Sequence, residues 1–222
     1  MNVTSRFSSW RAVLAPVVLL AGGALLTGCP SAAAHTPQGG HDLYESCKAC
    51  HGNHGEGQAY VAAPAIAGLP LWYVESTVRK FRTGLRGAHP DDAEGLRMRP
   101  MSRQMASDFE VKTVSAYVAA MPAVRSAPTL TGGNASLGQG SYAVCAACHG
   151  PTGMGNEQLK APPIAGQADW YLLSSLKKFK SGVRGAAPGD ITGSQMRPMA
   201  ATLVDEQAMK NVISHIGTLS GH

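Results

Sequence analysis

Two C-x-x-C-H pentapeptides, Cys47–His51 and Cys145–His149, constrain this chain of 222 residues more than any other feature. The spacing is the attachment signature of c-type haem. Two thiols three positions apart on one helical turn add to the two vinyl groups of a single porphyrin, and the histidine that follows faces the metal as its proximal ligand. The sequence therefore predicts two covalently bound haem c groups, attached through Cys47, Cys50, Cys145 and Cys148 and ligated by His51 and His149.

Three other uses of a C-x-x-C pair fit the sequence less well. A structural zinc site needs four clustered Cys or His ligands, whereas the two pairs here lie far apart and each is followed by its own histidine. A thioredoxin-like dithiol or a disulfide does not require histidine at the next position, and here the histidine occurs twice. Covalent haem accounts for the four cysteines and the two histidines of these motifs.

The chain also contains an internal duplication. The shift that places one haem motif on the other needs no insertion to superpose Tyr44 on Tyr142, Pro64 on Pro162, Gly68 on Gly166, Trp72-Tyr73 on Trp170-Tyr171, Phe81 on Phe179, Arg86-Gly87 on Arg184-Gly185, Asp92 on Asp190 and Met98–Met101 on Met196–Met199. A repeat of roughly a hundred residues has the size of a domain. We therefore expect two small domains, each of which depends on its porphyrin for much of its core.

The N-terminal segment indicates export. Arg6 and Arg11 are its only charges, and the apolar stretch that follows, 12–26, is too short for a comfortable membrane span. We therefore expect a signal peptide over 1–28. This prediction agrees with covalent haem, which is attached on the far side of the bacterial cytoplasmic membrane.

The fifth cysteine favours processing as a lipoprotein. Leu26-Thr27-Gly28-Cys29 resembles a lipobox, the site at which bacterial lipoproteins are cleaved and acylated on the cysteine. We expect a lipid anchor on Cys29, a tether over 29–39 and a protein held at the periplasmic side of a membrane. Ordinary cleavage after Ala34, at an A-x-A-like site, is the competing interpretation and would remove Cys29.

Sequence patterns predict an all-α fold. In each copy one helix enters the haem motif, with Gly40 and Tyr44 of the first copy, like Gly138 and Tyr142 of the second, on one helix face. Second helices are expected over 71–83 and 170–181, each ended by glycine, and third helices over 108–120 and 205–218. The glycine- and proline-rich segments 53–70 and 150–163 are expected to be loops. The domain boundaries that follow are 40–125 and 137–222, with a linker over 126–136.

A methionine is expected as the sixth ligand of each iron. Met-Arg-Pro-Met occurs just before the third helix of both copies, as 98–101 and 196–199. Thioether is the soft ligand that gives an iron centre of high potential. A single apolar Met usually fills a core, but recurrence at an equal distance from both haem motifs favours one ligand in each pair. The recurrence alone does not choose between Met98 and Met101, or between Met196 and Met199.

From about Gly40 onward the chain resembles the class I cytochromes c, and in particular the two-haem electron carriers of the c-four type. The resemblance rests on the two haem motifs, on the Pro-x-Ile-Ala-Gly runs that end at Gly68 and Gly166, and on a Met ahead of the last helix. It implies two tandem class I cytochrome c domains, each of about three helices wrapped around a covalently bound haem.

The resemblance also implies roles for individual residues. It selects Met98 and Met196 as iron ligands, because the family's ligand lies seven residues before an apolar residue at the start of the final helix segment. It further implies that the carbonyl groups of Pro64 and Pro162 accept the Nδ1 hydrogen of the proximal histidines. Four recurring side chains either hydrogen-bond haem propionates or serve as core and solvated surface: Trp72, Trp170, Arg86 and Arg184.

The function expected from this site is outer-sphere electron transfer in a respiratory chain, without a small-molecule substrate. Suitable redox partners are a quinol-oxidising complex and a terminal oxidase. An electron-accepting subunit of a periplasmic dehydrogenase has the same chemistry and differs only in partner. A two-haem peroxidase would need the copies to diverge at the Met pair, and they do not.

Charge excludes nucleic acid as a partner. The formal net charge of +5 includes Arg6 and Arg11 of the leader, and the propionates of two haems bring the mature protein to about neutral.

Overall fold

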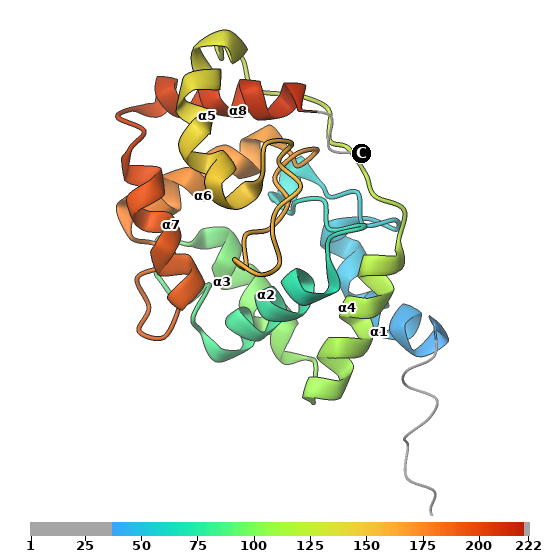
Figure 1. The fold of residues 1–222 in the computed structure, drawn as a ribbon. Helices are drawn as coiled ribbons and strands as arrows, with labels where there is room; N and C mark the ends of the chain where they lie inside the picture. The colour runs from blue at the N-terminus through green and yellow to red at the C-terminus, as the bar shows by residue number, and fades with distance from the viewer. Residues whose placement is uncertain (1–36, 220–222) are drawn as a thin grey trace, which may run out of the picture. The chain divides into compact units, whose positions relative to one another are not determined.

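The computed structural model describes residues 37–219, which form helices joined by loops (Figure 1). In chain order these are α1 (Pro37–His51), the 3-10 helix η2 (Ala59–Val61), α2 (Leu71–Thr83), α3 (Ala93–Arg103), α4 (Asp108–Ala120), α5 (Ala135–His149), α6 (Asp169–Ser181), α7 (Ile191–Ala201) and α8 (Glu206–Thr218). Within 37–219 no β-strand forms, and the bridges Gln58–Ala63 and Asn156–Ala161 are isolated. The all-α prediction is confirmed.

The predicted signal peptide over 1–28, the anchor at Cys29 and most of the tether lie outside the described residues. Among the helices of 37–219, none combines the length and the apolar character needed to span a bilayer.

Helix ends follow from local sequence. Ser107 begins α4 because its hydroxyl accepts a hydrogen bond from the Glu110 amide at 3.2 Å, and the Asp205 carboxylate caps α8 in the same way, 2.7 Å from the Ala208 amide. Helices α2 and α6 end where Gly84 and Gly182 adopt φ of 83° and 84°, a conformation that glycine enters without strain.

Each copy has one α-helix more than the sequence led us to expect. The Met-Arg-Pro-Met runs do not merely precede the last helix but lie inside α3 and α7. Pro100 and Pro198 argued against helix there, because proline removes a backbone hydrogen bond to the residue four positions earlier. Both helices are nevertheless capped at their start, where Asp92 and Asp190 accept from backbone amides.

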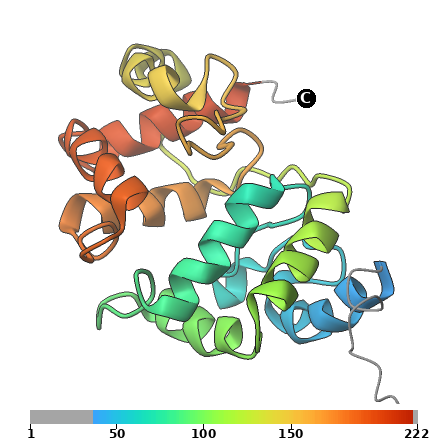
Figure 2. The same ribbon diagram turned by 60° about the horizontal axis from the view of Figure 1, so that its bottom comes forward.

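The first and last helices of each copy cross in close contact: α1 packs against α4, and α5 against α8 (Figures 1 and 2). Glycine permits the approach. A Cβ at Gly138 on α5 would lie 2.0 Å from the Asn211 carbonyl oxygen of α8, and one at Gly40 on α1 would lie 2.6 Å from Tyr117 Cβ of α4.

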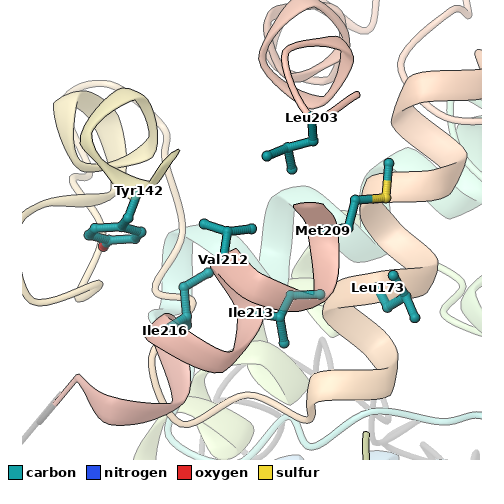
Figure 3. Packing of buried hydrophobic residues seen from close by; sticks show 7 residues of the cluster. All are labelled: Tyr142, Leu173, Leu203, Met209, Val212, Ile213 and Ile216. Atoms are coloured by element: carbon teal, nitrogen blue, oxygen red, sulfur yellow. The ribbon is translucent and has the colours of Figure 1, made fainter. Parts of the chain in front are cut away.

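An apolar core lies beside each crossing. In the second copy it joins side chains of α5, α6 and α8 with Leu203 from the turn before α8 (Figure 3): Tyr142, Leu173, Leu203, Met209, Val212, Ile213 and Ile216. The first copy uses Tyr44, Val74, Met105, Val111, Val114 and Val118. Most of these positions correspond in the repeat, so the duplication extends to the packing of the core.

The connection between the copies is held against the second one. The Arg125 guanidinium donates to the carbonyl oxygens of Gly217 and Leu219 at the end of α8. Further along, the Thr129 hydroxyl donates to the Asp169 carboxylate at 2.7 Å. The chain between α4 and α5 therefore does not act as a free spacer.

Candidate haem sites

The two histidines of the haem motifs end α1 and α5 and are buried, with 7% of His51 and 6% of His149 exposed. His51 Nδ1 lies 2.9 Å from the Pro64 carbonyl oxygen, and His149 Nδ1 lies 2.7 Å from that of Pro162. These are the contacts that the family resemblance implied.

Burial sets the protonation of these histidines. It lowers the pKa of both imidazoles, and the hydrogen bond to the proline carbonyl opposes that change only in part. A neutral ring that donates its Nδ1 hydrogen to Pro64 or Pro162 keeps the lone pair on Nε2 free for a metal.

The cysteines, histidine and methionines of each copy line one cavity. In the first copy that cavity is bounded by Cys47, Cys50 and His51 from α1 and by Met98 and Met101 from α3. In the second copy Cys145, Cys148, His149, Met196 and Met199 bound the corresponding cavity. The structure therefore brings together, in each copy, the attachment residues, the proximal ligand and both candidate distal ligands.

The two methionines of each pair differ in surroundings. Met101 Sδ lies 3.7 Å from Nε2 of the exposed Gln104, and 37% of Met199 is exposed. Met98 and Met196 are partly buried. Met101 is partly buried as well, so exposure separates the two methionines only in the second copy.

A tyrosine supports the haem motif of each copy. The Tyr44 hydroxyl donates to the Gly52 carbonyl oxygen at 2.7 Å, and the Tyr142 hydroxyl donates to that of Gly150 at the same distance. Each bond ties the motif helix to the first residue after its histidine, which fixes the direction in which the chain leaves the site.

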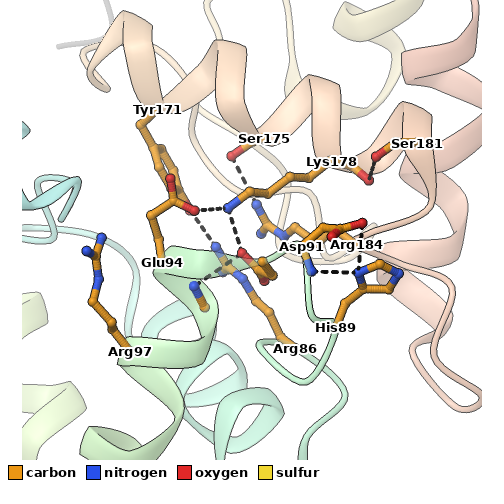
Figure 4. A network of polar contacts seen from close by, with 12 residues as sticks. Arg86, His89, Asp91, Glu94, Arg97, Tyr171, Ser175, Lys178, Ser181 and Arg184 are labelled. Carbon is orange, nitrogen blue, oxygen red and sulfur yellow. Dashed lines mark hydrogen bonds and ion pairs between the residues drawn. The ribbon is translucent and has the colours of Figure 1, made fainter.

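Some side chains line both cavities. They include Tyr73 and Arg86 from the first copy and Tyr171 and Arg184 from the second. The Arg86 guanidinium donates to the Tyr171 hydroxyl at 2.9 Å, while Arg184 donates to the Ser175 hydroxyl at 3.0 Å (Figure 4). The two haem sites therefore share a wall, which we call the arginine wall.

The arginine wall has an excess of positive charge. Within residues 37–219 neither Arg86 nor Arg184 forms an ion pair with a carboxylate. Burial alone would raise the pKa of the Tyr171 phenol, but the two guanidinium groups outweigh burial and hold that pKa below its usual value. Cations that are partly buried without forming an ion pair are costly, and haem propionates are anions of the right kind to offset them. The residues present therefore fit haem.

Each arginine is partly buried and donates to a hydroxyl group, so neither is a free surface group, and hydrogen bonds from them to haem propionates stay a prediction. The tryptophans lie in a way the sequence did not indicate. Trp72 of the first copy lines the cavity of the second, and Trp170 lines that of the first.

Sequence reasoning missed a second set of residues at the sites. Lys80 Nζ of the first copy donates to Asp190 Oδ1 of the second, and Lys178 Nζ of the second donates to Asp92 Oδ1 of the first, each at 2.6 Å. Their recurrence in the repeat was a signal, but recurrence does not reveal that matched residues bind crosswise.

Comparison with known proteins agrees with this site. The cytochrome c family model matches residues 38–122 and 135–220, so the chain belongs to the cytochrome c family. Two family domains, each with one haem motif, define a dihaem cytochrome c that binds two haem c groups covalently and carries electrons.

Particular relatives resemble most of the chain. The thiosulfate dehydrogenase electron acceptor of Stutzerimonas stutzeri (strain A1501) is 31% identical over 193 residues, which cover 82% of this chain and 84% of that protein. The thiosulfate dehydrogenase TsdBA of Marichromatium purpuratum has a structure similar to 84% of this chain, with a TM-score of 0.67 and 25% identity; the match covers 41% of that longer chain. Reduced recombinant cytochrome c4 from Pseudomonas stutzeri matches 83% of this chain and 98% of its own, with a TM-score of 0.62 and 26% identity.

Proposed function

We propose that this dihaem cytochrome accepts electrons from an exported dehydrogenase at one haem and delivers them from the other, toward a terminal oxidase. The observation that carries the proposal is the arginine wall, which lines both cavities and so brings the two sites together in one chain. When bound, each haem supplies a one-electron iron couple. The chain's own residues attach and orient it and offset its charge.

The proposed iron ligands are the histidine of each motif and the inner methionine of each pair. His51 and Met98 come from different helices and line one cavity, as do His149 and Met196. Met199 is more exposed than Met196, which supports Met196 as the ligand, and Met98 is its counterpart in the repeat. Two rigid ligands leave no coordination position for a substrate, so the proposal includes no catalysis by the chain itself.

A thiosulfate-oxidising dehydrogenase is the proposed donor. The support is the relative that is named an electron acceptor of such an enzyme and that aligns with 82% of this chain. A quinol-oxidising complex is the second candidate, favoured by the likeness to cytochrome c4 over both domains.

The donor is tested by stopped-flow mixing of the ferric holoprotein with a purified thiosulfate dehydrogenase and thiosulfate. We expect catalytic amounts of enzyme to reduce both haems, while thiosulfate without enzyme reduces neither. A parallel reaction uses a quinol-oxidising complex and quinol. Fast reduction in the second reaction alone would replace the proposed donor by the second candidate, and reduction in neither would contradict the electron-acceptor role with both.

The absence of catalysis is tested with carbon monoxide and hydrogen peroxide. If both irons have two protein ligands, the ferrous protein should not bind carbon monoxide. It should also react with hydrogen peroxide no faster than a small free haem peptide does. Binding of carbon monoxide by one haem would instead favour the peroxidase alternative.

The proposed location is the periplasmic side of a membrane, with the chain anchored by a lipid on Cys29. The support is the lipobox-like sequence 26–29 after a short apolar stretch. Cys29→Ser should shift the haem protein from the membrane fraction to the soluble one, with Ser31→Ala as the matched control. Equal membrane retention of both variants would contradict the lipid anchor.

A further inference from the structure

The two copies exchange a matched pair of lysines. Lys80 near the end of α2 reaches Asp190 in front of α7, and Lys178 near the end of α6 reaches Asp92 in front of α3. The residues correspond in the repeat, so one kind of bond is made twice in opposite directions, as in a contact across a two-fold axis. Figure 4 shows Lys178 extending from its helix toward the network that contains Glu94.

Both bonds are largely removed from solvent. The two aspartates are each 4% exposed, and the lysines are 23% exposed for Lys80 and 18% for Lys178. Buried ion pairs need further hydrogen bonds to be stable, and these have them. Lys178 also binds the Glu94 carboxylate, and Lys80 also binds the Thr192 hydroxyl.

Each lysine binds the aspartate that caps the start of a helix. Asp92 Oδ1, which accepts from Lys178, also accepts from the Gly95 amide at 3.2 Å and so caps α3. Asp190 Oδ1 does the same for α7, at 3.1 Å from the Gly193 amide. A single carboxylate oxygen in each copy therefore joins the start of one helix to the opposite domain.

The capped helices carry the methionines. Met98 lies one helical turn beyond the Gly95 amide that Asp92 accepts from, and Met196 stands in the same relation to Gly193. The helix start has little room to move. A Cβ at Gly95 would lie 2.1 Å from the Asp92 carboxylate and 2.7 Å from Gly87 Cα.

We propose that Lys178 positions the methionine helix of the first domain, and Lys80 that of the second, so that the distal ligand of each haem is held in place by the opposite domain. This inference rests on the proposal that a methionine of each helix ligates iron. Loss of a lysine would leave a buried carboxylate unpaired, loosen the helix cap and raise the fraction of molecules in which the methionine is off the iron.

The alternative is that the two lysines only help the domains dock, and it predicts a different result. If the lysines only joined the domains, either substitution would weaken both sites alike. The positioning role predicts a crossed pattern, in which Lys178→Met opens the first site and Lys80→Met opens the second. The affected haem then lies in the domain that was not changed.

The experiment reads each site separately in the full-length ferric holoprotein. Met196→His removes the red methionine-to-iron band of the second site, so that the remaining band reports the first site. Met98→His does the reverse. In each background we measure that band and the apparent affinity for cyanide, which binds only when the methionine has left the iron.

We expect Lys178→Met to raise the cyanide affinity of the first site about tenfold or more and to leave the second within twofold; Lys80→Met should give the reverse. Lys177→Met is the matched control, because Lys177 is 49% exposed and pairs with Glu206 of its own domain at 2.5 Å. It should change neither site. Asp92→Asn, which keeps an oxygen for the Gly95 amide, should reproduce part of the Lys178→Met effect if that variant does not fold.

Three results would overturn the inference: no change in either site, an equal change in both, or a change confined to the domain that carries the substitution. A wild-type protein without the red band would instead refute methionine ligation itself. The two failures are therefore distinguishable.

Discussion

Replacing Gly138 by alanine tests how closely the first and last helices of the second domain approach. An added Cβ would lie 2.0 Å from the carbonyl oxygen of Asn211 and 2.4 Å from its carbonyl carbon, both of which are backbone atoms of α8. Gly140 is on the same helix two residues later, and a Cβ there meets nothing within 4 Å. The two substitutions add the same atom to the same helix, one inside the crossing and one outside it.

The magnitudes follow from two opposing effects. Inside the crossing, the helices must move apart because backbone cannot rotate away as a side chain does, and overpacking of this kind costs about 3 kcal/mol. Replacing a helical glycine by alanine stabilises the helix by about 1 kcal/mol. We therefore expect Gly138→Ala to lower the free energy of unfolding by about 2 kcal/mol and Gly140→Ala to raise it by about 1 kcal/mol.

The assay is urea unfolding of the holoprotein, followed by far-ultraviolet circular dichroism and by the red methionine-to-iron band. In the Met98→His background, where only the second domain keeps the band, Gly138→Ala should lose it at a lower urea concentration than the unaltered Gly138 protein, and Gly140→Ala at a higher one. If the two variants were equally stable, α5 and α8 would not meet at Gly138, and the description of the crossing would be wrong.

Three further predictions concern the first domain. Met98→Leu should remove about half of the red band, lower the potential of that haem and open it to carbon monoxide; an unchanged spectrum would reject Met98 as the ligand. Burial would raise the pKa of the Asp92 and Glu94 carboxyls, but the Lys178 hydrogen bonds outweigh it and lower both. Their stabilisation is present above the unfolded pKa of about 4 and is lost as pH falls through the folded values, so acid should reduce the urea midpoint more in the wild type than in Asp92→Asn. Glu94→Thr, which copies the second domain, should raise the first haem's potential by about 40 mV, from about 1 kcal/mol of lost Coulomb energy, and a redox titration that shows a decrease would contradict this.

The sequence carried most of the information on the haem sites because their chemistry is local. A pentapeptide holds both attachment cysteines and the proximal ligand, so the spacing alone determined which residues meet. Helices α2, α4, α6 and α8 were also predictable, since glycine ends two of them and acidic or hydroxyl residues begin the others.

Helices α3 and α7 were not predictable by the same rules. Pro100 and Pro198 have an unfavourable intrinsic propensity within helices, and tertiary contacts override it. The Asp92 cap is local, but two further contacts come from elsewhere in the chain: Gly87, which lies against Gly95 at the start of α3, and the lysine of the opposite domain. No local pattern records these two contacts.

A duplicated chain also hides contacts that pass between its copies. Recurrence of Lys80 as Lys178 and of Asp92 as Asp190 fits a bond within each copy as well as a bond between them, and the sequence does not distinguish the two. In the folded chain the bonds are crossed. The arginine wall was hidden for the same reason, because Arg86 meets a tyrosine of the other copy.

Crossed contacts have a consequence for how two haems in one chain become different. When matched residues bind reciprocally, they give the two sites equal surroundings. Two differences lie at the interface. Glu94 faces Lys178 where Thr192 faces Lys80, and Arg86 binds Tyr171 of the other copy while Arg184 binds Ser175 of its own copy. Unequal sites would give direction to a carrier that receives electrons at one haem and releases them at the other, and these contacts are two at which the sites of this chain differ.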